Sequence, residues 1–165
     1  MTGHTPYHIA AEVADKFWDS DASDERKMVL KQNWEKITED KLSQMSPKDR
    51  TVKTYMAMTP KIFYRPTYDL SWIYELVESN QDITLHLFNV IFKDYDIANR
   101  PGRIETPVFL AIGRYDYLCP YFIWDDRRDI LANLSYNLFE KSGHFPMVEE
   151  QELFDNKLIK WIENH

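Results

Sequence analysis

The 165-residue chain is poor in glycine, cysteine and long apolar runs, and each shortage excludes a class of protein. It has 4 glycines, where average usage of about 7% would give about 12, so it has few positions for phosphate-cradling loops or strained turns. Cys119 is its only cysteine, which excludes an internal disulfide and favours a reducing compartment. The longest apolar run covers residues 108–112, far short of the roughly 20 residues that span a bilayer. With no visible signal peptide, we expect a cytoplasmic protein.

The chain has no excess of positive charge. It carries 27 acidic residues against 20 lysines and arginines, for a net charge of -7 at pH 7. Proteins that bind nucleic acid are generally basic, so we expect no nucleic-acid partner, and we expect no membrane partner. Hydrophobic residues at 44% and charged residues at 28% are typical of a globular domain, or of a large piece of one.

The first hundred residues are predicted to be helical. Ser23 is a candidate N-cap because Asp24 and Glu25 follow it and suit the positive end of a helix dipole. Ser46 and Pro47 form a second start signal, since proline has its φ preset for the first helical position. Helices are predicted over about residues 6–18, from 24 through 37, from 47 to 60, from 66 through 77, and over 83–92. The aromatic residues of this section are expected to lie mostly in the core.

The pattern changes at the breaker Arg100-Pro101-Gly102. Five consecutive apolar residues, 108–112, then predict a strand buried on both faces. A helix over about residues 120–131, a strand over 134–139 and a helix over about 149–163 complete a βαβα unit, with parallel strands and a right-handed crossover. The chain is therefore predicted to divide into a helical section, residues 1–100, and an α/β section, residues 101–165.

Two polar residues follow the predicted strands. Asp116 comes just after the first strand and His144 just after the second. Because neighbouring parallel strands end at the same edge of a sheet, where α/β proteins form their sites, the two side chains should meet. A carboxylate beside an imidazole fixes its tautomer and stabilises the imidazolium, which is the acid–base half of a catalytic triad. A simpler role also stays open, in which Asp116 only supports the helix after Pro120.

Residues 105–162 resemble the C-terminal end of an α/β-hydrolase. The resemblance rests on the segments PVFLAIGRYD at 107–116 and SGHFP at 142–146, with Pro120, Asn133-Leu134, Phe139-Glu140, Glu149-Glu150 and Phe154. In that family these two segments carry the triad acid and the triad base, which implies those roles for Asp116 and His144. The segments are most similar to proline-iminopeptidase-like members, and the helical section resembles the cap of that fold. The resemblance implies amide or ester hydrolysis without a cofactor, on a small-molecule or peptide substrate. Phe145 is then the candidate substrate contact.

One part of the family pattern is missing from this sequence. In α/β-hydrolases the serine lies in G-x-S-x-G, before the cap, but no two of the four glycines here are four positions apart. We therefore expect the chain to be the C-terminal half of such an enzyme, inactive by itself. Two parallel strands do not form an independent sheet, so we expect the open, apolar edge to pair with a second copy, an exchanged segment or a separate N-terminal hydrolase fragment.

Other interpretations remain. The chain could be a non-catalytic interaction or assembly module derived from such a hydrolase, or a helical domain with an incidental βαβ tail. Ser142 fits a turn residue better than a nucleophile, and Cys119 fits a structural thiol. His4 and His8 could share a helix face as metal ligands, but no third ligand is evident, so no metal is predicted. The acidic side chains of Glu149 and Glu150 are expected to interact favourably with the positive N-terminal end of the last helix.

Overall fold

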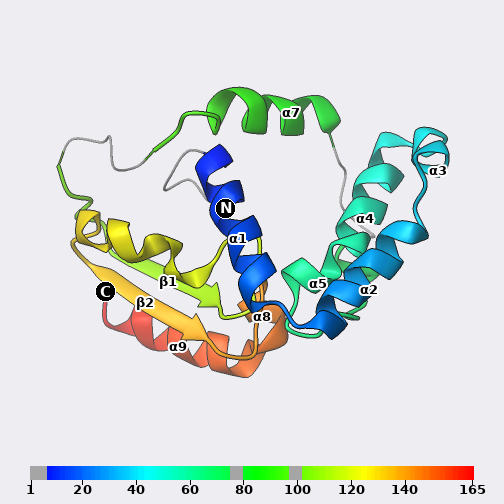
Figure 1. Ribbon diagram of the computed structural model, residues 1–165. Helices are drawn as coiled ribbons and strands as arrows, with labels where there is room; N and C mark the ends of the chain where they lie inside the picture. The colour runs from blue at the N-terminus through cyan, green and yellow to red at the C-terminus, as the bar shows by residue number, and fades with distance from the viewer. Residues whose placement is uncertain (1–6, 75–79, 97–101) are drawn as a thin grey trace.

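The computed structural model describes residues 7–74, 80–96 and 102–165 (Figure 1). The helical elements before residue 97 are α1 (Tyr7–Asp21), α2 (Asp24–Glu35), α3 (Glu39–Ser43), α4 (Pro47–Ala57), α5 (Thr59–Ile62), α6 (Ser71–Tyr74), α7 (Gln81–His86) and the π-helical turn η1 (Leu87–Ile91). The elements after residue 101 are β1 (Val108–Gly113), the 3₁₀ helix η3 (Tyr121–Ile130), β2 (Leu134–Phe139), α8 (Pro146–Glu149) and α9 (Gln151–Glu163). None of the helices in these described ranges has the length and apolar character needed to cross a membrane.

The predicted start signals of two helices are confirmed. At the start of α2, the Ser23 side chain accepts a hydrogen bond from the backbone N–H of Arg26 at 3.2 Å. At the start of α4, Ser46 Oγ accepts from the backbone N–H of Asp49 at 3.1 Å and donates to its carboxylate at 2.7 Å. Pro47 occupies the first turn of α4, as expected. Each cap satisfies an N–H group that the helix itself leaves without a partner.

The helices of the C-terminal section differ in part from the predicted ones. The segment between the strands is the 3₁₀ helix η3 and not an α-helix. The last predicted helix is confirmed as α9, which begins two residues later than predicted because Glu150, with φ of -126° and ψ of 49°, is not helical. In the helical section, Leu76 and Val77 lie outside the described residues.

The two strands pair in parallel, as predicted. Val108 lies opposite Leu134 and Gly113 lies opposite Phe139. Within the described part of the chain the sheet has these two strands, so the other edge of β1 has no strand beside it. The prediction that residues 108–112 are buried on both faces is wrong, because residues 108–111 are half-buried. A strand with one neighbour and one well-covered face cannot be buried on every side.

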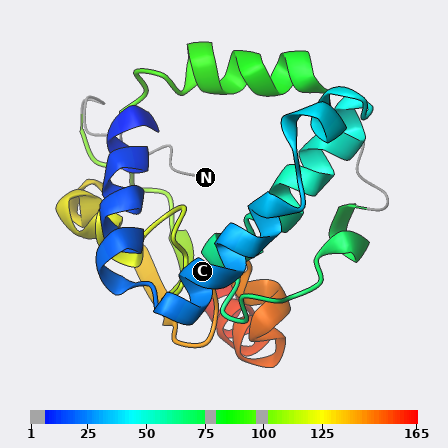
Figure 2. The same ribbon diagram turned by 45° about the vertical axis from the view of Figure 1, so that its right-hand side comes forward.

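Aromatic residues join the sheet to the helices on either side of it. Phe109 of β1 contacts Phe154 and Trp161 of α9, with ring centroids 6.0 and 5.7 Å apart. Helix α1 approaches from the side away from α9 (Figures 1 and 2), and its Phe17 stacks on Tyr117 at 5.0 Å. The α1 contact joins the helical section to the loop that follows β1.

The rest of the helical section is less tightly packed. Helices α2 and α4 lie side by side, and α7 with η1 crosses the far end of this section (Figure 2). Ile83 and Val90 on that crossing segment are 58% and 61% exposed. Several aromatic side chains expected in the core are instead exposed, namely Trp34, Tyr64 and Trp72. The core of this section is a smaller cluster around Ile62, Phe63 and Leu70.

Candidate active site

The structure brings Asp116 and His144 together at the carboxyl ends of the strands. His144 Nδ1 lies 2.6 Å from Asp116 Oδ2, a short hydrogen bond. The loops that carry these residues also bond to each other, since the N–H of Tyr115 donates to the carbonyl of Ser142 at 2.9 Å. The two side chains are therefore held by backbone contacts as well as by their own hydrogen bond.

Each oxygen of the Asp116 carboxylate has its own partners. Oδ1 accepts from the backbone N–H groups of Leu118 and Cys119, at 2.9 and 2.8 Å, while Oδ2 faces His144. The residue is 4% exposed. Asp116 thus bonds the backbone just after it, ahead of Pro120, and contacts the imidazole at the same time. Two N–H donors on one oxygen fix the direction in which the other oxygen points.

Two glycines allow the loops to approach closely. A Cβ on Gly113 would collide with the carbonyl oxygens of Ser142 and Gly143, and a Cβ on Gly143 would collide with the carbonyl of Ile62. These obstacles are backbone atoms, which cannot rotate out of the way as a side chain can. Glycine is therefore needed at both positions for the two loops and residues 59–64 of the helical section to meet.

Residues 59–64, called the bridging segment below, contain α5 and bond to both loops. The carbonyl of Ile62 accepts from the N–H of His144 at 2.6 Å, and the carbonyl of Lys61 accepts from the N–H of Tyr117 at 3.0 Å. Tyr117 is the residue after Asp116. The helical section therefore fixes the backbone at or beside both members of the pair.

A buried guanidinium holds the bridging segment in place. Arg26 donates to the carbonyls of Pro60 and Phe63 at 2.6 and 2.7 Å, and to the carbonyl of Tyr64. Arg26 is 6% exposed, and burial lowers its pKa, although arginine remains charged in proteins. Sequence reasoning missed Arg26, because nothing in the spacing of α2 distinguishes it from a surface arginine.

Glu149 on α8 is a second residue whose contacts the sequence did not reveal. Its Oε2 accepts from the N–H of Gly143 at 2.6 Å, and its Oε1 accepts from the N–H of Tyr64 at 2.7 Å. Burial raises the pKa of Glu149 from 4.5 to about 7, and its N–H donors and nearby Arg26 act in the opposite direction. The carboxylate therefore bonds the His144 loop and the bridging segment at the same time.

Glu150, beside it, bonds the same loop but not the bridging segment. Its Oε2 accepts from the N–H of Lys141 at 2.8 Å and from Ser142 Oγ at 2.6 Å. The sequence assigned both acids to the dipole of the last helix, whereas their carboxylates satisfy donors of the loop before His144. The adjacent acid pair in the printed sequence is the signal that could have pointed to this arrangement.

The alternative nucleophiles are buried. Ser142 is 0% exposed and its hydroxyl donates to Glu150, so this hydroxyl is not placed to act as a nucleophile. Burial raises the pKa of the Cys119 thiol to about 12, which leaves almost no thiolate at neutral pH. Phe145 lies edge-on to His144 with ring centroids 5.3 Å apart, and its role in substrate contact stays a prediction.

The metal interpretation is not tested. His4 lies outside the described residues and the side chain of His8 is not described. Within the described part of the chain, no three His, Cys, Asp or Glu side chains gather as metal ligands would.

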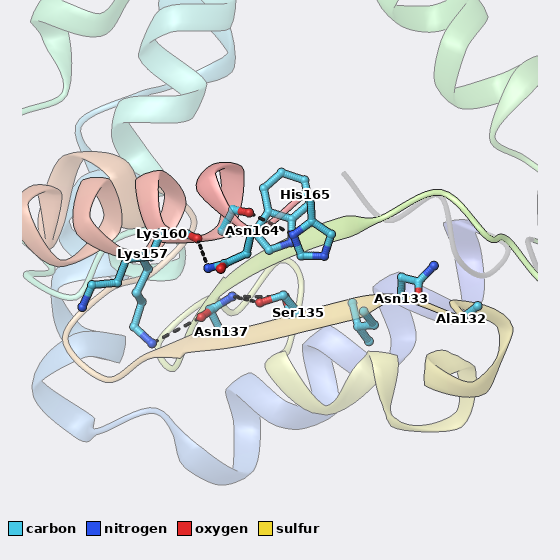
Figure 3. Close-up of a pocket in the computed structure, with 10 residues that line it drawn as sticks. Ala132, Asn133, Ser135, Asn137, Lys157, Lys160, Asn164 and His165 are labelled. Carbon is cyan, nitrogen blue, oxygen red and sulfur yellow. Dashed lines mark hydrogen bonds between the residues drawn. The ribbon is translucent and has the colours of Figure 1, made fainter.

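A pocket of about 560 Å³ lies between β2 and the C-terminal end of α9 (Figure 3). Ser135 and Asn137 of β2 line one side, and Lys157 of α9 donates to Asn137 from the other at 3.3 Å. Neither Asp116 nor His144 lines it. The pocket is therefore separate from the acid–base pair.

The chain has curated relatives, although no family model matches it. The AB hydrolase superfamily protein YclE of Bacillus subtilis is 31% identical over 151 residues, which are 91% of this chain and 53% of YclE. The proline iminopeptidases of Lactobacillus crispatus and Clostridioides difficile are 32% and 34% identical, over 44% and 41% of this chain and 24% and 23% of their own lengths.

Solved structures share the fold. A hydrolase of the α/β fold family from Bacillus anthracis superposes on 96% of this chain and 56% of its own, with a TM-score of 0.61 at 19% identity. VinJ superposes on 98% of this chain and 55% of its own, also with a TM-score of 0.61, at 17% identity. The sequence relatives of this chain are an AB hydrolase superfamily protein and proline iminopeptidases, and its structural neighbours have the α/β-hydrolase fold. It spans about half the length of YclE and less of the iminopeptidases, and it matches their C-terminal part. The predicted family resemblance and fold class are thus confirmed.

Proposed function

We propose that this α/β-hydrolase chain supplies the general base of a serine hydrolase together with the acid that orients it. His144 takes the proton of the serine and returns it to the leaving group, and Asp116 stabilises the imidazolium between these steps. The observation that carries the proposal is the 2.6 Å contact between Nδ1 and the carboxylate. Because Nδ1 is engaged and the imidazole side chain is 30% exposed, Nε2 is the nitrogen that meets the hydroxyl.

In this proposal the serine and the oxyanion donors belong to a segment outside this chain. That segment corresponds to the part of YclE that this chain does not span. We propose that the strand next to that serine segment pairs with the open edge of β1. The half-buried residues 108–111 support this, because apolar side chains of a parallel strand gain from a second neighbour. An N-terminal hydrolase fragment is the proposed partner, and the isolated chain is then inactive as a serine hydrolase.

The names of the relatives support a substrate class, and the contact between Phe145 and the bridging segment supports a place for the substrate. The name proline iminopeptidase, carried by three of them, supports an amide or peptide substrate. In this proposal residues 1–100 act as the cap over the site. Phe145, which stacks on Phe63 with centroids 5.3 Å apart, lies where the cap meets the imidazole and contacts the substrate there.

The test is a chimera in which this chain replaces the matching C-terminal part of YclE. A fluorophosphonate probe, which labels only an activated serine, is expected to label the chimera and not the 165-residue chain. Asp116→Asn is expected to lower turnover by about 10⁴-fold, the size of this effect in serine triads, and His144→Ala to abolish labelling. Labelling of a folded chimera that survives His144→Ala would contradict the proposal. A folded chimera that never labels would favour the alternative, a non-catalytic assembly module derived from a hydrolase.

A further inference from the structure

One carboxylate closes a ring of contacts around the backbone of His144. Glu149 bonds the N–H of Gly143, the residue before His144, and the N–H of Tyr64, the last residue of the bridging segment. Within that segment the carbonyl of Ile62 accepts the N–H of His144 at 2.6 Å. The ring therefore runs from Glu149 through Gly143, His144 and the bridging segment back to Glu149.

The Tyr64 peptide in this ring is held on both of its sides. The N–H of Tyr64 donates to Glu149 at 2.7 Å, and the carbonyl of Phe63, which belongs to the same peptide group, accepts from the buried Arg26 at 2.7 Å. Such a peptide cannot shift toward either partner without lengthening the other hydrogen bond. A displacement of the His144 loop is thus resisted by α2, α8 and the bridging segment together.

Glu150 offers a natural comparison, because it bonds the same loop without closing a ring. One of its oxygens accepts from the N–H of Lys141 and from Ser142 Oγ, at 2.8 and 2.6 Å, and both of these donors lie in the loop before His144 rather than in the bridging segment. Glu149 and Glu150 are adjacent and of equal charge. If a substitution of Glu149 has an effect that the same substitution of Glu150 lacks, the effect is therefore due to the broken ring of contacts and not to the loss of an acid near the loop.

We propose that Glu149 is a positioning residue, whose carboxyl group holds the His144 imidazole at bonding distance from Asp116 by tying its loop to the helical section. The inference rests on the proposed function, since positioning serves catalysis only if His144 is the base. Two accepting oxygens are required, because both partners are N–H donors. Glutamine in this place would turn an NH₂ group toward one of them and leave that donor unbonded.

The experiment is solution NMR on the ¹⁵N-labelled 165-residue chain, comparing wild type, Glu149→Gln and Glu150→Gln. The reporters are the low-field Nδ1–H resonance of His144 and hydrogen exchange at the amides of Gly143 and Tyr64. Glu149→Gln is expected to broaden or abolish the imidazole resonance and to speed exchange at one of the two amides by roughly tenfold or more, the size of one charge-assisted hydrogen bond. Glu150→Gln is expected to leave both reporters unchanged.

An unchanged resonance in Glu149→Gln, with both amides protected as in wild type, would overturn the inference. If the glutamine variant does not fold, Glu149→Asp replaces it. The shorter side chain keeps its charge but cannot reach both donors, so equal protection at both amides would again overturn the ring. A wild-type chain without the imidazole resonance would contradict the proposed function, and exchange at the two amides would still decide the ring by itself.

Discussion

Replacing Arg26 by methionine tests the most heavily bonded side chain of the site. The change keeps much of the apolar volume and removes the donors of three carbonyls. Pro60 and Phe63 are fully buried, so their carbonyls would lose a partner that water cannot replace. An unsatisfied buried acceptor costs about 1–3 kcal/mol, which gives a loss of about 2–6 kcal/mol. Tyr64 is 37% exposed and adds little, since water can reach its carbonyl.

Such a loss is a large part of the roughly 5–15 kcal/mol that stabilises an ordinary domain. The assay is urea unfolding of the 165-residue chain, followed by tryptophan fluorescence. Lys27→Met is the matched control, because Lys27 is the cation next to Arg26 in the sequence, is only half-buried and donates to the carbonyl of Asp19. The control is expected to change the free energy of unfolding by no more than about 0.5 kcal/mol. An Arg26→Met chain as stable as this control would refute the reasoning, since the three carbonyls would then not depend on the guanidinium.

Three further predictions concern the neighbouring residues. Gly143→Ala should lower stability by about 1–3 kcal/mol, because its Cβ would meet the Ile62 carbonyl, and an unchanged melting temperature would contradict that close approach. The pKa of Glu149 is about 7 in the folded chain against 4.5 unfolded, so the native state binds the proton more tightly and stability falls as pH rises through this window. The full shift corresponds to about 3 kcal/mol, and partial exposure reduces this to about 1–2 kcal/mol. Urea unfolding between pH 4.5 and 7 should show a shallower decline in Glu149→Gln, and parallel curves would count against the shift. Cys119 should react with a thiol reagent at least ~100-fold more slowly in the native chain than in urea, and equal rates would show that the thiol is accessible.

The pair and its strands could be predicted from sequence because the signals are local. A five-residue apolar run closed by Gly113 defines β1, alternation defines β2, and Asp116 and His144 follow within a few residues of each strand end. Parallel pairing then places both at one edge without further information. The 3₁₀ form of η3 was missed, because the sequence pattern of residues 120–131 does not distinguish it from an α-helix.

The supports of the pair could not be predicted, because their partners are far away in the chain. Arg26 bonds Pro60 across 34 positions, and Glu149 bonds Tyr64 across 85. Helical periodicity tells which face of α2 is apolar, but it carries no information about a carbonyl on another element. The sequence pattern around Arg26 is that of a surface residue, so its burial can be recognised only from the three-dimensional position of the bridging segment.

The imidazole tautomer of His144 tests the central claim most directly. Long-range ¹H–¹⁵N correlation spectra of the chain distinguish a proton on Nδ1 from one on Nε2. The 2.6 Å contact predicts that the neutral ring carries its proton on Nδ1, donated to Asp116, and that Asp116→Asn weakens this preference. A proton found on Nε2 in the wild-type chain, or spectra that do not respond to Asp116→Asn, would contradict the account of an acid–base pair ready for a serine.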